Sequence, residues 1–143
     1  MFIKQLSVFI ENSQGNLARV TDALAANNIN IISLSLADTS DFGLLRMIVS
    51  EPEKSVEALK AGGFMAKLAD VIAVKTNNAS GAIQKLLSVI SKSVNVEYMY
   101  ILSTSGDTAS VIIKATPLEE AAKTLTDAGY ELYSPEEAYK LQK

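Results

Sequence analysis

Apolar and polar residues alternate at the start of the chain in the pattern of a β-strand. Leu6, Val8 and Ile10 are separated by single residues of the opposite face, which predicts a strand with one strongly buried side. From Gly15 to about Asn27 the apolar residues recur at helical spacing instead. The chain therefore begins with a strand followed by a helix.

A second alternating segment, Ile32–Leu36, has serines between its apolar residues. The polar segment Asp38–Gly43 follows it and leads into a further apolar segment, Leu44–Val49. Two alternating segments joined by a short polar segment are typical of a β-hairpin. We therefore expect strands two and three to pair with each other.

Proline and glycine mark the next helix. Pro52 is placed to open it, and Gly62-Gly63 would stop it before Phe64 begins a fourth strand. The predicted order of elements over the first half of the chain is thus β-α-β-β-α-β.

The second half repeats the first at a nearly constant offset. Gly15 recurs as Gly81, Pro52 as Pro117, and Gly63 as Gly129. Such regular spacing indicates duplication. The elements expected in the second copy are Val71–Thr76, a helix through Ile83–Ile90, Val94–Leu102, Ser110–Ala115, a helix over Pro117–Ala128, and Tyr130–Tyr133.

The junction between the copies falls inside an extended segment. Phe64–Thr76 is longer than the usual strand of about 5–6 residues, so we expect it to divide near Asp70. This places one module at residues 1–69 and the other at 70–143, with almost no linker, and predicts that the modules pack rigidly. Ser134 and Glu137 match a capping box, which predicts a short terminal helix over Ser134–Leu141 that covers an edge or a cavity.

Composition excludes several classes of function. The net charge is −3 without a cluster of Lys and Arg, so a nucleic-acid partner is not expected. No run of about 18 apolar residues and no signal-peptide core occurs, which predicts a cytoplasmic protein with no membrane contact. Cys and His are absent, and no phosphate-binding loop or metal-ligand spacing is present. We therefore expect neither an enzyme nor a bound cofactor or metal.

The β-α-β-β-α-β order is that of ferredoxin-like folds, which host many functions. Three segments carry a more specific resemblance: Glu11–Leu17, with a Gly between strand and helix, Asn27–Ile31 before the second strand, and Ser93–Tyr100 in the second copy. On these residues the chain resembles ACT modules over essentially its whole length. Leu34–Gly43 and Val96–Tyr100 together look like stand-alone tandem ACT proteins. The expected fold class is therefore α+β, with two tandem modules that each have an antiparallel sheet and helices on one face.

The resemblance implies a regulatory protein that holds an amino acid where two ACT modules meet. The ligand would lie near the first loop of one module and the second strand of its neighbour. A helix N-terminus offers unpaired N–H groups and partial positive charge to a carboxylate. The residues placed to do this are Gln14, Gly15, Asn16 and Leu17. The acceptors for the ammonium group would be Asp38, Asp41 or strand carbonyls near Leu36.

Each of these residues also has a purely structural interpretation. Gly15 could serve only the turn or could also contact a ligand, and for Gly81, after Ser80 in the second copy, the turn is favoured. Asp38 and Asp41 could make local hydrogen bonds within the hairpin, which is the more usual role of such residues. Arg46 is expected to face solvent or the partner module.

Tyr98 and Tyr100 share one strand face, where the first copy has the small residues Ser33 and Ser35. Aromatic side chains with polar tips are common where two surfaces meet. We expect them to pack between modules or subunits, with ligand contact as the second interpretation. A sheet face without helices must be covered, so a homodimer is expected.

Two functions remain open. The first is an amino-acid sensor that acts in trans on an enzyme, a transporter or a regulator. The second is a structural or dimerisation module without a ligand. Many ACT loops carry Pro-Gly, whereas this chain has Gln14-Gly15 and Ser80-Gly81, which supports the second function.

Overall fold

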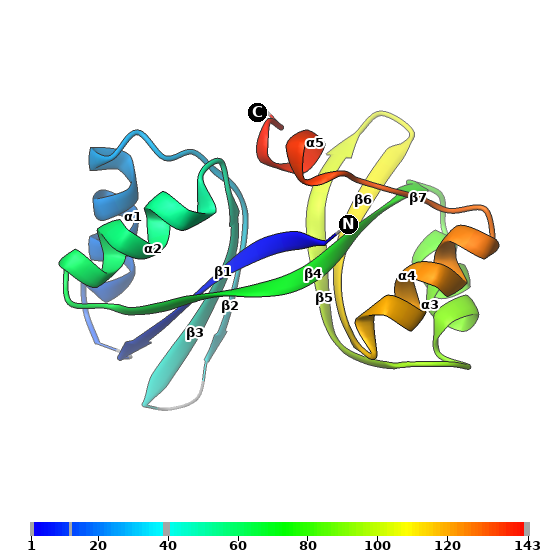
Figure 1. The fold of residues 1–143 in the computed structure, drawn as a ribbon, viewed down its shortest axis with the longest axis horizontal. Coiled ribbons are helices and arrows are strands. Elements are labelled where there is room, and N and C mark those ends of the chain that lie inside the picture. The colour runs from blue at the N-terminus through cyan, green and yellow to red at the C-terminus, as the bar shows by residue number, and fades with distance from the viewer. Residues whose placement is uncertain (1, 12, 39–40, 142–143) are drawn as a thin grey trace. The chain divides into compact units, whose positions relative to one another are not determined.

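The computed structural model describes residues 2–11, 13–38 and 41–141, except for the side chain of Asp38. These residues form two compact units. One contains Lys4–Ala69 with the last residues from Tyr139 onward, and the other contains Asp70–Ala138 with the first residues up to Ile3. Each unit combines an antiparallel sheet with helices (Figure 1), which confirms the expected α+β class of two ferredoxin-like modules.

The first unit has the predicted order of elements. They are β1 (Ile3–Glu11), α1 (Asn16–Ala26), β2 (Ile31–Asp38), β3 (Phe42–Val49), α2 (Pro52–Ala61) and the start of β4 (Met65–Asn77). Its strands lie in the order β2-β3-β1-β4. The hairpin of β2 and β3 forms as expected, with Leu36 opposite Leu45. Thr39 and Ser40, in its predicted turn, lie outside the described residues.

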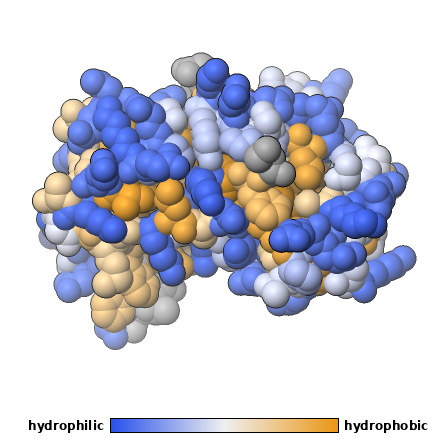
Figure 2. Space-filling model, viewed as in Figure 1, coloured by the Kyte–Doolittle hydropathy of each residue, from blue (hydrophilic) through white to orange (hydrophobic). Residues whose placement is uncertain are grey.

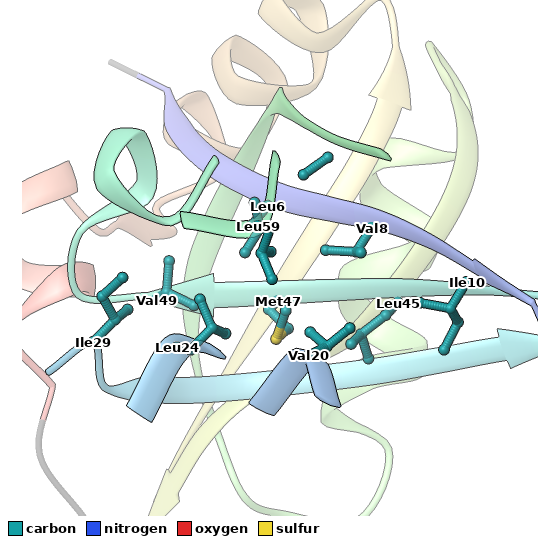
Figure 3. Packing of buried hydrophobic residues seen from close by; sticks show 11 residues of the cluster. Leu6, Val8, Ile10, Val20, Leu24, Ile29, Leu45, Met47, Val49 and Leu59 are labelled. Carbon is teal, nitrogen blue, oxygen red and sulfur yellow. The ribbon is translucent and has the colours of Figure 1, made fainter. Parts of the chain in front are cut away.

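The core of the first unit lies between its helices and one face of the sheet. Val20 and Leu24 on α1 and Leu59 on α2 are fully buried against the alternate residues of β1 and β3 (Figure 3). The sheet contributes Leu6, Val8, Ile10, Leu45, Met47 and Val49. Because side chains alternate across a strand, Ser7, Phe9 and Arg46 belong to the face without helices.

The second unit repeats this plan. After β4 come α3 (Ala82–Ile90), β5 (Asn95–Ser105), β6 (Thr108–Thr116), α4 (Leu118–Asp127), β7 (Glu131–Leu132) and α5 (Pro135–Tyr139). The strand order is β5-β6-β4-β7. Leu86 and Ile90 on α3 and Leu125 on α4 pack against Ile72, Val74, Val111 and Ile113 of the sheet.

The extended segment does not break near Asp70 as expected, although the boundary between the two units falls there. Met65–Asn77 forms a single strand of 13 residues, whose first part belongs to the first unit and whose second part belongs to the second. No Pro or Gly interrupts this segment. Each part also has hydrogen-bonded neighbours, with β1 for the first unit and β6 for the second, so nothing ends the extended conformation at Asp70.

The predicted capping box near the C-terminus is confirmed. The backbone N–H of Ser134 donates to Glu137 at 3.0 Å, and the N–H of Glu137 donates to Ser134 Oγ at 3.2 Å. The helix, α5, is shorter than expected, at Pro135–Tyr139. Lys75 on β4 pairs with Glu131 at 2.7 Å and with Glu137 at 3.2 Å, and these pairs attach α5 to the second unit.

Candidate functional site

A cavity of about 360 Å³ opens in the first unit. It lies where β1 ends, α1 begins and the chain enters β4. The residues that line it are Phe9, Ile10, Glu11, Asn16, Arg19, Phe42, Gly63, Phe64 and Met65. This volume is at the lower end of the range of about 300–1,000 Å³ for small-molecule sites, so the cavity suits a small metabolite.

Arg19 supplies the positive charge of this cavity. Its guanidinium carbon lies 4.8 Å from the centroid of the Phe64 ring, and its Nη1 donates to Asn16 Oδ1 at 3.2 Å. Asn16 in turn donates to the carbonyl of Glu11 and to Ser13 Oγ, both at 2.8 Å. These contacts fix the guanidinium over the ring, a favourable arrangement for a cation. Among the described residues Arg19 has no carboxylate partner, so its charge is available to a ligand.

Exposed aromatic side chains form another side of the cavity. The rings of Phe9 and Phe42 lie 6.0 Å apart at an angle of 30°, and both side chains remain about half exposed, at 52% and 50%. Met65 is 71% exposed beside them. Apolar side chains reach the surface of the protein in several places (Figure 2). Phe9, Phe42 and Met65 differ from other exposed apolar side chains because they line a cavity that also contains the charged side chain of Arg19.

The second unit has a cavity at the equivalent place, with a volume of about 230 Å³. It is lined by Thr76, Asn77, Ala82, Lys85, Val89, Ala128, Gly129 and Tyr130. Most of these positions correspond to residues of the first cavity at the offset that separates Gly15 from Gly81. The pairs are Ile10 and Thr76, Glu11 and Asn77, Asn16 and Ala82, Arg19 and Lys85, Gly63 and Gly129, and Phe64 and Tyr130. A cation and an aromatic ring occur in both cavities.

Both helix starts use a glycine in the left-handed conformation. Gly15 precedes α1 with φ +87°, and Gly81 precedes α3 with φ +84°. A Cβ added at either position would meet nothing within 4 Å. The glycines are therefore required by backbone conformation in this structure, not by lack of space.

Of the residues expected to bind the carboxylate, Asn16 alone lines the first cavity. Gln14 and Gly15 lie in the turn before α1, and Leu17 is in its first turn, beside the cavity but not in its wall. The structure does not bring the expected ammonium acceptors to this place. Leu36 is on β2, the backbone of Asp38 pairs with Gly43, and Asp41 is exposed next to β3.

The residues singled out in the second copy lie at two separate places. Ser80 and Gly81 precede α3, next to the second cavity but outside its wall. Tyr98 and Tyr100 stack on β5, with ring centroids 6.5 Å apart, and both are partly exposed. They pair with Lys114 and Ile112 of β6, on the sheet face opposite α3 and α4. Their contact with a partner or ligand stays a prediction.

Comparisons with known proteins identify the family. The family model of the ACT domain pair matches residues 1–138. A solved structure of a protein from Bacteroides thetaiotaomicron is 38% identical, with a TM-score of 0.93 and coverage of 99% of this chain and 98% of that one. The ligand-free regulatory subunit of aspartate kinase from Thermus thermophilus is 23% identical, with a TM-score of 0.67 and coverage of 88% and 92%. That of Thermus flavus is 22% identical, with a TM-score of 0.62 and coverage of 87% and 91%.

A search of curated proteins returned no significant match. Within the described part of the chain, no helix is both long and apolar enough to cross a membrane, and no group of three His, Cys, Asp or Glu side chains is placed to hold a metal ion. The family match covers nearly the entire length, and the two units have the same order of elements and equivalent cavities. The chain belongs to the family of ACT domain pairs.

Proposed function

We propose that this protein is an amino-acid sensor that binds its ligand in the cavity beside α1 and acts in trans on a metabolic enzyme, a transporter or a regulator. ACT domains are regulatory domains. The observation that carries the proposal is the duplicated cavity, because a cation and an aromatic ring line the cavity at the same helix start in both units.

The first cavity offers a partner for each charge of an amino acid. The ligand carboxylate would pair with the Arg19 guanidinium, which presents several N–H donors in one plane. The partial positive charge at the start of α1 favours an anion at the same end of the cavity. Glu11, with an exposed side chain in the cavity wall, would accept the ligand ammonium group. No metal or cofactor is needed for this recognition.

The proteins with the same architecture support a regulatory role. Two of them are regulatory subunits of aspartate kinase by name. By analogy, this chain would transmit ligand binding to a separate protein. The regulated protein would be identified as one whose association with this chain changes when the ligand is added.

The proposal is tested by thermal unfolding with each of the twenty proteinogenic amino acids. A ligand at about 100 times its Kd stabilises the native state by about 2.7 kcal/mol, which raises the melting temperature by several degrees. Arg19→Met should abolish this shift, because it removes the charge and keeps much of the apolar stem. Lys85→Met, the matched change in the second cavity, should leave binding in the first cavity intact. If no amino acid at millimolar concentration moves the transition, the protein is instead a structural module.

A homodimer is part of this proposal. Leu34 and Leu36 are 48% and 45% exposed on β2, which is an edge strand of the first sheet. Exposed apolar residues on an unpaired edge favour association with a second chain. Sedimentation at micromolar concentration should give a species of twice the chain mass of 15.3 kDa, whereas a monomer would contradict it.

A further inference from the structure

We infer that the first cavity selects amino acids with a large apolar or aromatic side chain. This inference rests on the proposed function and concerns which ligand the same site prefers. It is drawn from the division of the cavity wall into a charged part and an aromatic part, and from the different residues that the second unit has at the positions of Phe9 and Phe42.

The charged groups of the cavity match the main-chain charges of an amino acid and leave no charge for its side chain. The ionisable side chains of the wall are Arg19 and Glu11. A zwitterion would use both. A ligand side chain with a third charge would lose hydration among the remaining apolar wall residues without gaining an ionic partner. Charged amino acids are therefore disfavoured.

The aromatic part provides the surface on which a large side chain would lie. The ring centroids of Phe9 and Phe42 lie 6.0 Å apart, yet about half of each side chain remains exposed. Met65 lies at the same cavity with most of its side chain in water. A ring or a branched aliphatic chain placed against them would remove apolar surface from water on both sides. A serine or glycine ligand would leave this surface exposed.

The second unit shows that these side chains are not required by the fold. At the repeat offset, Phe9 corresponds to Lys75, and Phe42 corresponds to Thr108. Each pair belongs to the same strands of its own unit, since Phe42 is opposite Glu11 and Thr108 is opposite Asn77. Lys75 does not line the second cavity and instead pairs with Glu131 and Glu137. The aromatic wall is thus a feature of the first unit that has no counterpart at Lys75 and Thr108 of the second.

The test is isothermal titration calorimetry of the full chain with L-phenylalanine, L-leucine and L-methionine against L-serine, L-aspartate and L-lysine. We expect at least one of the large apolar ligands to bind ten times or more tightly than L-serine. Phe9→Thr and Met65→Thr should each reduce this ratio several-fold, because each removes apolar surface from the cavity wall. Both side chains are exposed, so the variants should still fold. Ile101→Thr, which removes a comparably exposed strand residue away from the cavity, should leave the ratio unchanged.

Three outcomes separate the inference from the proposed function. Tight binding of L-serine, L-aspartate or L-lysine in preference to the apolar ligands would overturn the inference and leave the sensor function standing. An apolar preference that survives both Phe9→Thr and Met65→Thr, in variants folded by circular dichroism, would place selection outside this wall and also overturn it. The absence of binding by any of the twenty amino acids would overturn the proposed function itself.

Discussion

Replacing Gly15 by asparagine should separate the two roles considered for this residue. Gly15 has φ +87° at the start of α1, a conformation that costs an ordinary L-residue about 1–2 kcal/mol. Asparagine adopts it more readily than alanine because its side chain can form local hydrogen bonds. A turn-only glycine should therefore tolerate Gly15→Asn better than Gly15→Ala.

The structure gives the size of the effect. A Cβ at Gly15 would meet no atom within 4 Å, so strain comes from the backbone angle and not from a clash. For a chain of 143 residues, a cost of about 1–2 kcal/mol corresponds to a fall in melting temperature of about 3–7 °C for Gly15→Ala. For Gly15→Asn the melting temperature should fall by less. Gly81, with φ +84° and the same open space, should give matching values and provides the internal control.

The assay combines thermal unfolding without ligand and calorimetric titration with the amino acid that binds. If a ligand approaches the backbone at Gly15, Gly15→Asn should retain most of its stability yet bind at least several-fold more weakly, and Gly81→Asn should bind normally. Gly15→Val should show the same asymmetry against Gly81→Val with larger losses. If Gly15→Ala and Gly15→Asn both keep the stability of the unchanged protein, the backbone argument is wrong. Equal loss of binding at both positions would show that both units bind ligand.

Three further predictions test other parts of the structure. Leu24 and Ile90 are fully buried at equivalent positions of the two cores. Leu24→Ala and Ile90→Ala should each lower the free energy of unfolding, measured with denaturant, by about 2–5 kcal/mol. A decrease of less than about 1 kcal/mol would contradict the packing. The hydrogen bond from the Ser134 N–H, and then the Lys75 ammonium, hold the pKa of Glu137 below its usual range. The carboxylate therefore stabilises the fold above the ordinary glutamate pKa, and this stabilisation is lost as the pH falls through the lowered value. Glu137→Gln should reduce the loss of stability at acid pH, and an unchanged loss would refute the role of Glu137. Changing both Tyr98 and Tyr100 to Asp should give monomers in sedimentation if they lie in the subunit interface, and a double variant that stays dimeric would place the interface elsewhere.

The fold can be predicted from the sequence because local patterns and tertiary packing agree in it. The alternation of Leu6, Val8 and Ile10 matches the buried face of β1, and the capping box at Ser134 forms as the sequence predicts. The long strand β4 departs from the expectation for a physical reason. Typical strand lengths describe a strand in one sheet, whereas β4 has hydrogen-bonded neighbours in both units.

The cavity is harder to predict because its wall comes from segments far apart in the sequence. Asn16 is evident from the helix start, but Phe64 and Met65 come from the entry to β4, with three elements between it and α1. Arg19 carries no motif, and its place over Phe64 is visible only in three dimensions. One signal is present in the sequence. Arg19 and Lys85 have the same separation as Gly15 and Gly81, so the repeat aligns a cation after each helix-start glycine.

The two copies differ at the position of Phe9 and Lys75, and the difference is related to how the chain continues after the last strand of each unit. The first unit passes through β4 directly into the second, so its part of β4 is not followed by a helix of the same unit, as β7 is in the second unit. In the second unit the chain continues past β7 into α5, and Lys75 at the equivalent position holds that helix through Glu137. The two equivalent strand positions therefore have different uses, and Lys75 in the second unit is an attachment point for the C-terminal segment. In the first unit the same position is the exposed Phe9, which lines a cavity together with Arg19, and ligand selection is therefore expected there.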